Sequence, residues 1–110
     1  MTKIKDLARL SQITGLILDL KLADLRATAA KRQHSLDLLA SLNTPPINTD
    51  LSLVAAHQAA LRYQHWADVR RAEINLALAR QTADMHMARD AAGQAFGKDQ
   101  ALRGIRAKLG

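Results

Sequence analysis

Residues 41–50 read SLNTPPINTD, and the adjacent prolines at positions 45 and 46 decide the expected fold. They are the only prolines in the 110-residue chain. Neither donates a backbone hydrogen bond, and the first disfavours the α conformation in the residue before it. A helix that arrives from the N-terminal side therefore ends near Asn43. Downstream, Asn, Thr and Asp at 48–50 are good N-caps for a second helix that starts at Leu51.

Each arm beside this break carries a stripe at spacings of three and four residues, the pattern of a coiled coil. The first stripe comprises Ile4, Ala8, Ser11, Gly15, Leu18, Leu22, Leu25, Ala29, Arg32, Leu36 and Leu39. The second comprises Leu51, Ala55, Ala59, Arg62, Trp66, Val69, Ala72, Leu76, Ala79, Ala83 and Met87. We therefore predict helices over 3–43 and 51–92 joined by a loop at 44–50. Because so short a loop folds two helices back on each other, the chain is expected to be all-α, one antiparallel coiled-coil hairpin domain over 1–110.

Pairing the arms about the loop centre gives an expected register. It places Leu39 opposite Val54, Leu25 near Trp66 to Val69, Leu18 near Leu76, and Ile4 near Met87. Tyr63 and Trp66 then lie on or beside the seam. Core packing is the favoured interpretation of this pair, and a binding anchor is the alternative if the indole is exposed.

Residues 93–110, GQAFGKDQALRGIRAKLG, differ from the arms because they hold four of the five glycines. The residues from Lys98 to Leu109 are compatible with continued helix, but each glycine costs about 1 kcal/mol relative to alanine. We expect a frayed or bent extension. Its basic residues could steer one end of the hairpin to an acidic partner surface; they are Lys98, Arg103, Arg106 and Lys108.

The first arm between Leu7 and Leu25 is apolar around much of its circumference, more than a two-helix hairpin buries. One interpretation is that the C-terminal segment folds over this surface. The other is a partner or self-association surface. The residues proposed for self-association are Ile13, Leu16, Ile17 and Leu20.

Several function classes find little support in the composition. The chain has no cysteine, and its four histidines lack the spacing of a helical metal site, although His34 and His57 could lie near each other across the hairpin. No nucleophile or phosphate-loop motif is present, so we expect neither an enzyme nor a cofactor or metal. The apolar run 13–22 is too short to span a bilayer, which favours a soluble cytoplasmic protein.

Residues 62–102, RYQHWADVRRAEINLALARQTADMHMARDAAGQAFGKDQAL, contain an aromatic pair, an Arg/Glu-rich stretch, a Leu/Ala seam and a basic end. In these features the chain resembles the FliJ/YscO-like stalk proteins of flagellar and type III secretion export. The resemblance implies a non-enzymatic partner of the export ATPase that inserts a hairpin end into the ATPase ring and promotes delivery to the export gate. The end expected to enter the ring combines Ile4 to Leu10 with Phe96 to Lys108. The residues expected to contact it are Leu7, Leu10, Phe96, Lys98, Arg103, Arg106 and Lys108.

Two other functions remain open. The first is a regulator or secretion adaptor in which two hairpins form a homodimeric four-helix bundle through the apolar surface of the first arm. The second is a small basic nucleic-acid-binding protein, which the net charge of +6 allows. It ranks last because the basic residues of the two arms are scattered among acids instead of gathered on one face.

Overall fold

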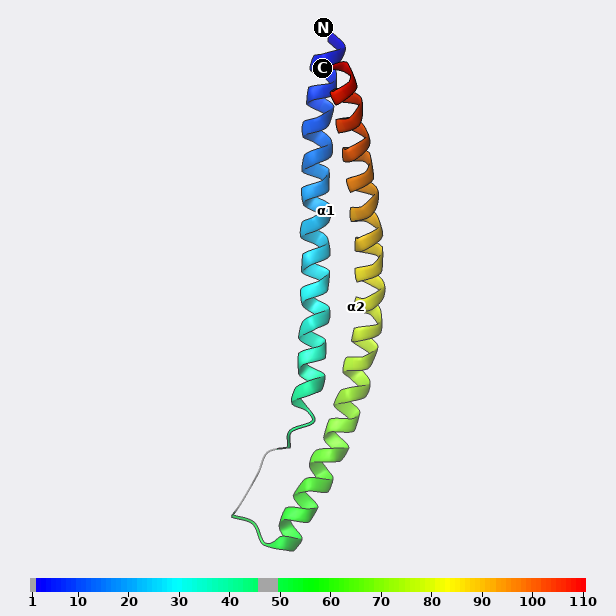
Figure 1. The fold of residues 1–110 in the computed structure, drawn as a ribbon. Coiled ribbons are helices and arrows are strands. Elements are labelled where there is room, and N and C mark those ends of the chain that lie inside the picture. The colour runs from blue at the N-terminus through cyan, green and yellow to red at the C-terminus, as the bar shows by residue number, and fades with distance from the viewer. Residues whose placement is uncertain (1, 46–49) are drawn as a thin grey trace. The chain divides into compact units, whose positions relative to one another are not determined.

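The computed structural model describes residues 2–45 and 50–110, and within them every regular element is an α-helix. Helix α1 spans Thr2–Ser41 and helix α2 spans Leu53–Leu109 (Figure 1). This confirms the predicted all-α helical hairpin. Contacts divide the chain into unit 1, Met1–Ala30 with Ala83–Gly110, and unit 2, Lys31–Thr82. Among the described residues, neither helix contains a stretch that is long and apolar enough to cross a membrane.

Both helices end close to the proline break, at slightly different residues than predicted. After Ser41, the amides of Leu42 and Asn43 donate to carbonyls three residues back, at 3.2 Å each, which tightens the last turn of α1. Helix α2 begins at Leu53 instead of Leu51, and its N-cap is Ser52, whose Oγ accepts from the Ala55 amide at 3.2 Å. Of the N-caps expected at 48–50, those at 48 and 49 lie outside the described residues.

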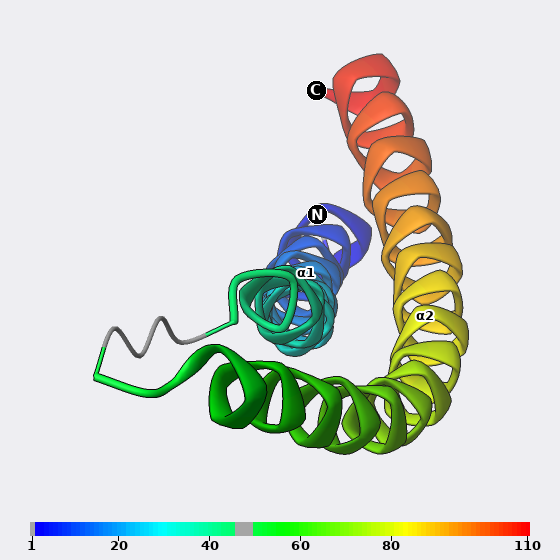
Figure 2. The same cartoon turned by 90° about the horizontal axis from the view of Figure 1, so that it is seen from below.

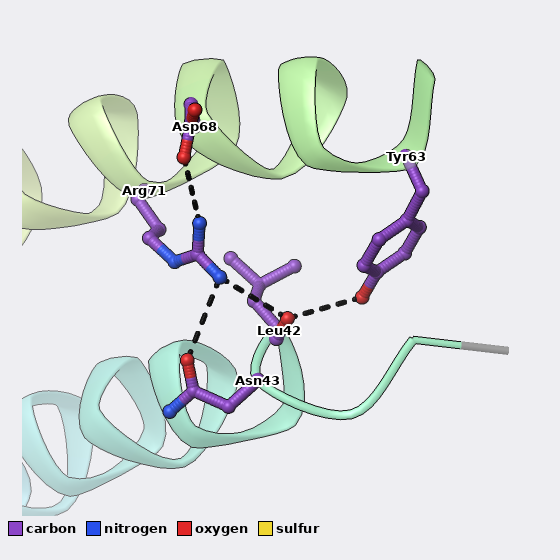
Figure 3. A network of polar contacts seen from close by, with 5 residues as sticks. All are labelled: Leu42, Asn43, Tyr63, Asp68 and Arg71. Carbon is purple, nitrogen blue, oxygen red and sulfur yellow. Dashed lines mark hydrogen bonds and ion pairs between the residues drawn. The ribbon is translucent and has the colours of Figure 1, made fainter. Parts of the chain in front are cut away.

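The C-terminal end of α1 is held by polar side chains of α2 (Figure 3). The Leu42 carbonyl accepts from the Tyr63 hydroxyl at 3.2 Å and from Arg71 Nη2 at 3.2 Å. The same guanidinium pairs with Asp68 at 2.8 Å and donates to Asn43 Oδ1 at 3.5 Å. Cations are favourable at a helix C-terminus because the last carbonyls carry partial negative charge. Arg71 therefore fixes where α1 stops along α2.

In unit 2 this anchoring produces a register that differs from the predicted one. Leu39 packs against the buried cluster of Leu42, Ala67 and Ile74, whereas its expected partner Val54 is exposed. Further along, Ser35 Oγ donates to Gln81 Oε1 at 2.6 Å, and Arg32 Nε donates to Thr82 Oγ1 at 3.0 Å. The first turns of α2, drawn in green, consequently lie beyond the end of α1 (Figure 1), and Figure 2 shows the same turns from below.

Unit 1 shows the same correction. Thr14 Oγ1 donates to Asp99 Oδ1 at 3.0 Å, so α1 lies against a part of α2 well beyond Leu76, and the expected contact of Leu18 with Leu76 is wrong. Ile4 shares a pocket with Arg106 and Leu109, far from its predicted neighbour Met87. Likewise Asp24 and Thr28, which flank Leu25, line a pocket with Ala88 and not with the predicted 66–69 segment.

The reason is the length of α2, which has 57 residues against 40 in α1. The C-terminal segment was expected to fray or bend after residue 92, but α2 continues without interruption to Leu109. The free-energy cost of its glycines is offset because their neighbours Ala92, Ala95 and Leu102 are buried against α1. Residues 93–109 therefore provide part of the helix that pairs with the first half of α1.

Helix α2 buries a different face from the one predicted. Its buried residues, which we call the inner face, are Ala67, Ile74, Ala88, Ala92, Ala95, Asp99 and Leu102. Alternating spacings of three and four within this set are those of a coiled coil. The predicted stripe of the second arm instead lies largely on the exposed side, where Trp66, Val69, Leu76 and Met87 are 50–70% exposed. Trp66 therefore does not fill the core, and Tyr63 beside it is half-buried against the inner face. The α1 stripe is largely confirmed, since most of its members are half-buried.

Candidate functional site

The first turns of α1 and the last turns of α2 lie side by side in unit 1, where Figure 1 places the two ends of the chain together. We call residues 2–10 and 98–110 the basic end. Ile4 and Leu7 from α1 line a small pocket with Arg106 and Leu109 from α2 and with Gly110, which follows that helix. The terminal segments that the sequence analysis combined are therefore neighbours.

The basic end carries a surplus of positive charge. Its basic residues are Lys3, Lys5, Arg9, Lys98, Arg103, Arg106 and Lys108, and its acidic residues are Asp6 and Asp99. Arg103 Nε pairs with Asp99 Oδ2 at 3.0 Å. The other basic side chains of this end form no ion pair within the described residues. Their charge is therefore available to an acidic partner.

A buried carboxylate lies behind this surface. Asp99 is only 1% exposed and occupies an inner-face position between Ala95 and Leu102. One of its oxygens accepts from Thr14 and the other from Arg103, each at 3.0 Å. Because each carboxylate oxygen has a partner, Asp99 has no unsatisfied acceptor that would point to a bound ligand. It ties α1 to α2 and holds the Arg103 stem while 64% of that side chain remains exposed.

Sequence reasoning did not single out Asp99. It lies seven residues after Ala92 and four after Ala95, so it continues the inner face of α2 into the segment that was expected to fray. A polar residue at a seam position is a recognised device for fixing register. Extending the seam past residue 92 would have identified it.

A groove runs between the helices beside this contact, and Lys98 lies on it. Its lining residues are Thr14, Ile17, Lys21, Ala91, Gln94, Ala95 and Lys98. Phe96, another expected contact, is exposed, but it follows Gln94 by two residues and so points about 200° away around the helix. Leu7 is half-buried in the terminal pocket, and Leu10 is exposed. The structure thus gathers Leu7 with Arg106 and does not bring Phe96 together with Lys98.

The apolar belt of α1, Ile13, Leu16, Ile17 and Leu20, remains exposed. Leu16 is 64% exposed and Leu20 is 70% exposed. The C-terminal segment does lie along this part of α1, as one interpretation expected, but it contacts the face that carries Ser11, Thr14 and Leu18. Ile17 lies at the edge of the belt and lines the groove with Gln94 and Lys98, whereas Leu16 and Leu20 point further around the helix. The interpretation that the C-terminal segment covers the whole belt is therefore wrong.

Metal-binding clusters are absent from the part of the chain that the structure describes: no three or more His, Cys, Asp or Glu side chains gather there. The possible approach of His34 to His57 is wrong, because the neighbouring Ser35 lies against Gln81.

A scan against protein-family models and searches of curated proteins and of solved structures found no match for this chain.

Proposed function

We propose that this chain is a non-enzymatic coiled-coil protein of the cytoplasm that binds the ring of a flagellar or type III export ATPase, as the stalk proteins it resembles do. The basic end enters the ring, and the chain promotes delivery of substrates to the export gate. The observation that supports this most is the basic end itself, where two adjacent helix ends combine unpaired positive charge with the apolar pocket at Leu7.

The mechanism needs no covalent chemistry. Basic side chains steer the helix pair to an acidic surface of the ring, and such steering accelerates association in a salt-dependent way. Apolar contacts at Ile4 and Leu109, which are 56% and 57% exposed, then slow dissociation. Asp99 and Thr14 keep the two helix ends in register while the docked end bears load.

The test reverses charge at the basic end and leaves its buried residues, Asp99 and Leu102, in place. In the triple variant K98E/R106E/K108E we expect the Kd for the purified ATPase to rise by roughly tenfold or more, because three attractive contacts become repulsive. Arg103 is left unchanged because it pairs with Asp99. Truncation after Gly97 is a poorer test, since it also removes the buried Asp99 and Leu102.

The matched control is R26E/K31E/R89E, which makes the same change in net charge at three residues outside the basic end. Both variants are titrated against the ATPase by surface plasmon resonance at two salt concentrations. Equal binding by the wild type and K98E/R106E/K108E would rule the proposal out.

A second candidate is a homodimeric four-helix bundle formed by two hairpins. It is favoured by the exposed belt of Ile13, Leu16, Ile17 and Leu20, which leaves large aliphatic surface in water next to a paired helix. In such a bundle the belt of one copy packs on the belt of another, and the chain acts as a regulator or secretion adaptor.

Light scattering distinguishes this candidate from the first. If the belt drives dimerisation, the wild type has the mass of a dimer at micromolar concentration. The double variant L16K/L20K then has the mass of a monomer, because burying charges at the centre of an interface costs several kcal/mol. Met87→Lys is the control, since Met87 is as exposed as Leu20, at 70%, but lies on α2. A monomeric wild type excludes the bundle.

A further inference from the structure

The exposed side of α2 in unit 2 carries an apolar stripe of its own. We call it the outer stripe, and its members are Trp66, Val69, Ala72, Leu76 and Ala79. Trp66 is 55% exposed, Val69 50% and Leu76 61%, while Ala67 and Ile74 on the inner face are buried. The spacings of three and four are those with which a helix meets another helix. Helix α2 therefore has a second seam that α1 does not use.

Trp66, the aromatic member of the stripe, packs beside Tyr63, which a hydrogen bond holds in place. The Trp66 ring lies 5.7 Å from the Tyr63 ring, centroid to centroid, at an interplanar angle of 43°. Tyr63 is itself tied to the Leu42 carbonyl by a hydrogen bond (Figure 3). A large side chain that is partly ordered before binding loses less entropy on docking, which is the property of an interface anchor.

The charges around the stripe indicate what it binds. Its two internal acids are already paired, Asp68 with Arg71 at 2.8 Å and Glu73 with Arg70 at 3.1 Å. Arg62, four residues before Trp66, and Arg80, four after Leu76, form no ion pair within the described residues. The outer stripe is thus bracketed by two free guanidinium groups, about 27 Å apart at 1.5 Å per residue.

These same charges disfavour a second copy of this chain as the occupant. An antiparallel pairing that places Trp66 opposite Leu76 of the other copy also places Arg62 opposite Arg80. A parallel pairing places each arginine near its own equivalent. Either arrangement brings like charges together at both ends, which is destabilising.

We propose that the outer stripe binds an amphipathic helix of another protein, one whose apolar stripe is bracketed by acidic residues that pair with Arg62 and Arg80. The surface lies in unit 2 and shares no residue with the basic end of unit 1. It adds a second binding activity to the function proposed above and does not depend on it.

Trp66 provides the readout, because it is the only tryptophan in the chain. The probe is a synthetic helical peptide of about four heptads with a leucine seam, carrying glutamates about 18 residues apart to match the two arginines. Titration of the full chain with this peptide is expected to shift the tryptophan emission to the blue, in a saturable manner. For an otherwise identical peptide with lysines in place of those glutamates, the Kd is expected to be higher by roughly tenfold or more.

A charge swap makes the test specific. The variant R62E/R80E is expected to reverse the preference and bind the lysine peptide more tightly, with an unchanged circular dichroism spectrum. Failure of the glutamate peptide to bind, equal binding of both peptides, or an unchanged preference in R62E/R80E overturns the proposal. So does a blue shift on concentrating the protein alone, which would identify a second copy as the occupant. Peptide binding is expected to be the same in K98E/R106E/K108E, so failure of the basic-end proposal is distinguishable.

Discussion

Replacing Ile74 with alanine is expected to destabilise unit 2 by roughly 2–5 kcal/mol, the range for truncation of a buried aliphatic side chain. Ile74 is 5% exposed and forms a cluster with Leu42 and Ala67, against which Leu39 and Tyr63 pack. Its truncation removes apolar burial and leaves a void at the point where α1 ends. The measurement is urea unfolding followed both by circular dichroism and by the emission of Trp66, which lies in the same unit.

Leu76→Ala is the matched control for this variant. Leu76 lies two residues further along α2 and is 61% exposed on the outer stripe. Its truncation is expected to change stability by less than about 0.5 kcal/mol, as for most surface substitutions. The comparison decides which face of α2 meets α1, because the seam predicted from sequence contains Leu76 and not Ile74. A larger loss for Leu76→Ala than for Ile74→Ala would restore the predicted seam.

The face of α2 was misassigned because that helix offers two heptad stripes of different bulk. The outer stripe has Trp66, Val69 and Leu76, whereas the inner face is built largely on Ala67, Ala88, Ala92 and Ala95. A pattern read by hydrophobic bulk favours the outer stripe. Packing favours the inner one, because alanines let two helix axes approach closely. Bulk alone does not determine which of two stripes meets a given partner.

The features that were predicted correctly depend on local chemistry. The helix break at the prolines follows from missing amide donors and restricted backbone angles, and the stripe of α1 follows from its periodicity. The grouping of the two terminal segments also held, because antiparallel pairing puts the start of α1 and the end of α2 on the same side, although their actual contact depends on the register. Their basic residues are evident from composition, so the charge of the basic end was predicted as well.

The register depends on contacts between residues far apart in sequence, and these have no local signature. Thr14 and Asp99, separated by 85 residues, are joined by a single hydrogen bond. Arg71 reaches the Leu42 carbonyl across 29 residues. Assuming arms of equal length that meet at the loop hides both contacts. Once α2 is allowed to start beyond the end of α1, its C-terminal segment becomes part of the pairing and Asp99 becomes a seam residue.

Cysteines placed at Thr14 and Asp99 are expected to form an intramolecular disulfide in nearly all molecules on mild oxidation. In the wild type Thr14 Oγ1 and Asp99 Oδ1 are 3.0 Å apart, and the chain has no other cysteine to compete. Since the bond closes a loop of 85 residues, the oxidised T14C/D99C variant is expected to be more stable than its reduced form by roughly 4–5 kcal/mol. Thiol alkylation with mass spectrometry gives the extent of oxidation, and urea unfolding with and without reductant gives the stability difference.

The control is I4C/M87C, which joins the two residues of unit 1 that the sequence-derived register pairs. Ile4 lies at the pocket with Arg106 and Leu109, so its cysteine is too far from position 87 for the short span that a disulfide permits. This variant is expected to stay reduced as a monomer under the same conditions. Rapid oxidation of I4C/M87C together with a reduced T14C/D99C would contradict the observed register. It would also remove the argument for the basic end, because Arg106 would no longer lie beside Leu7.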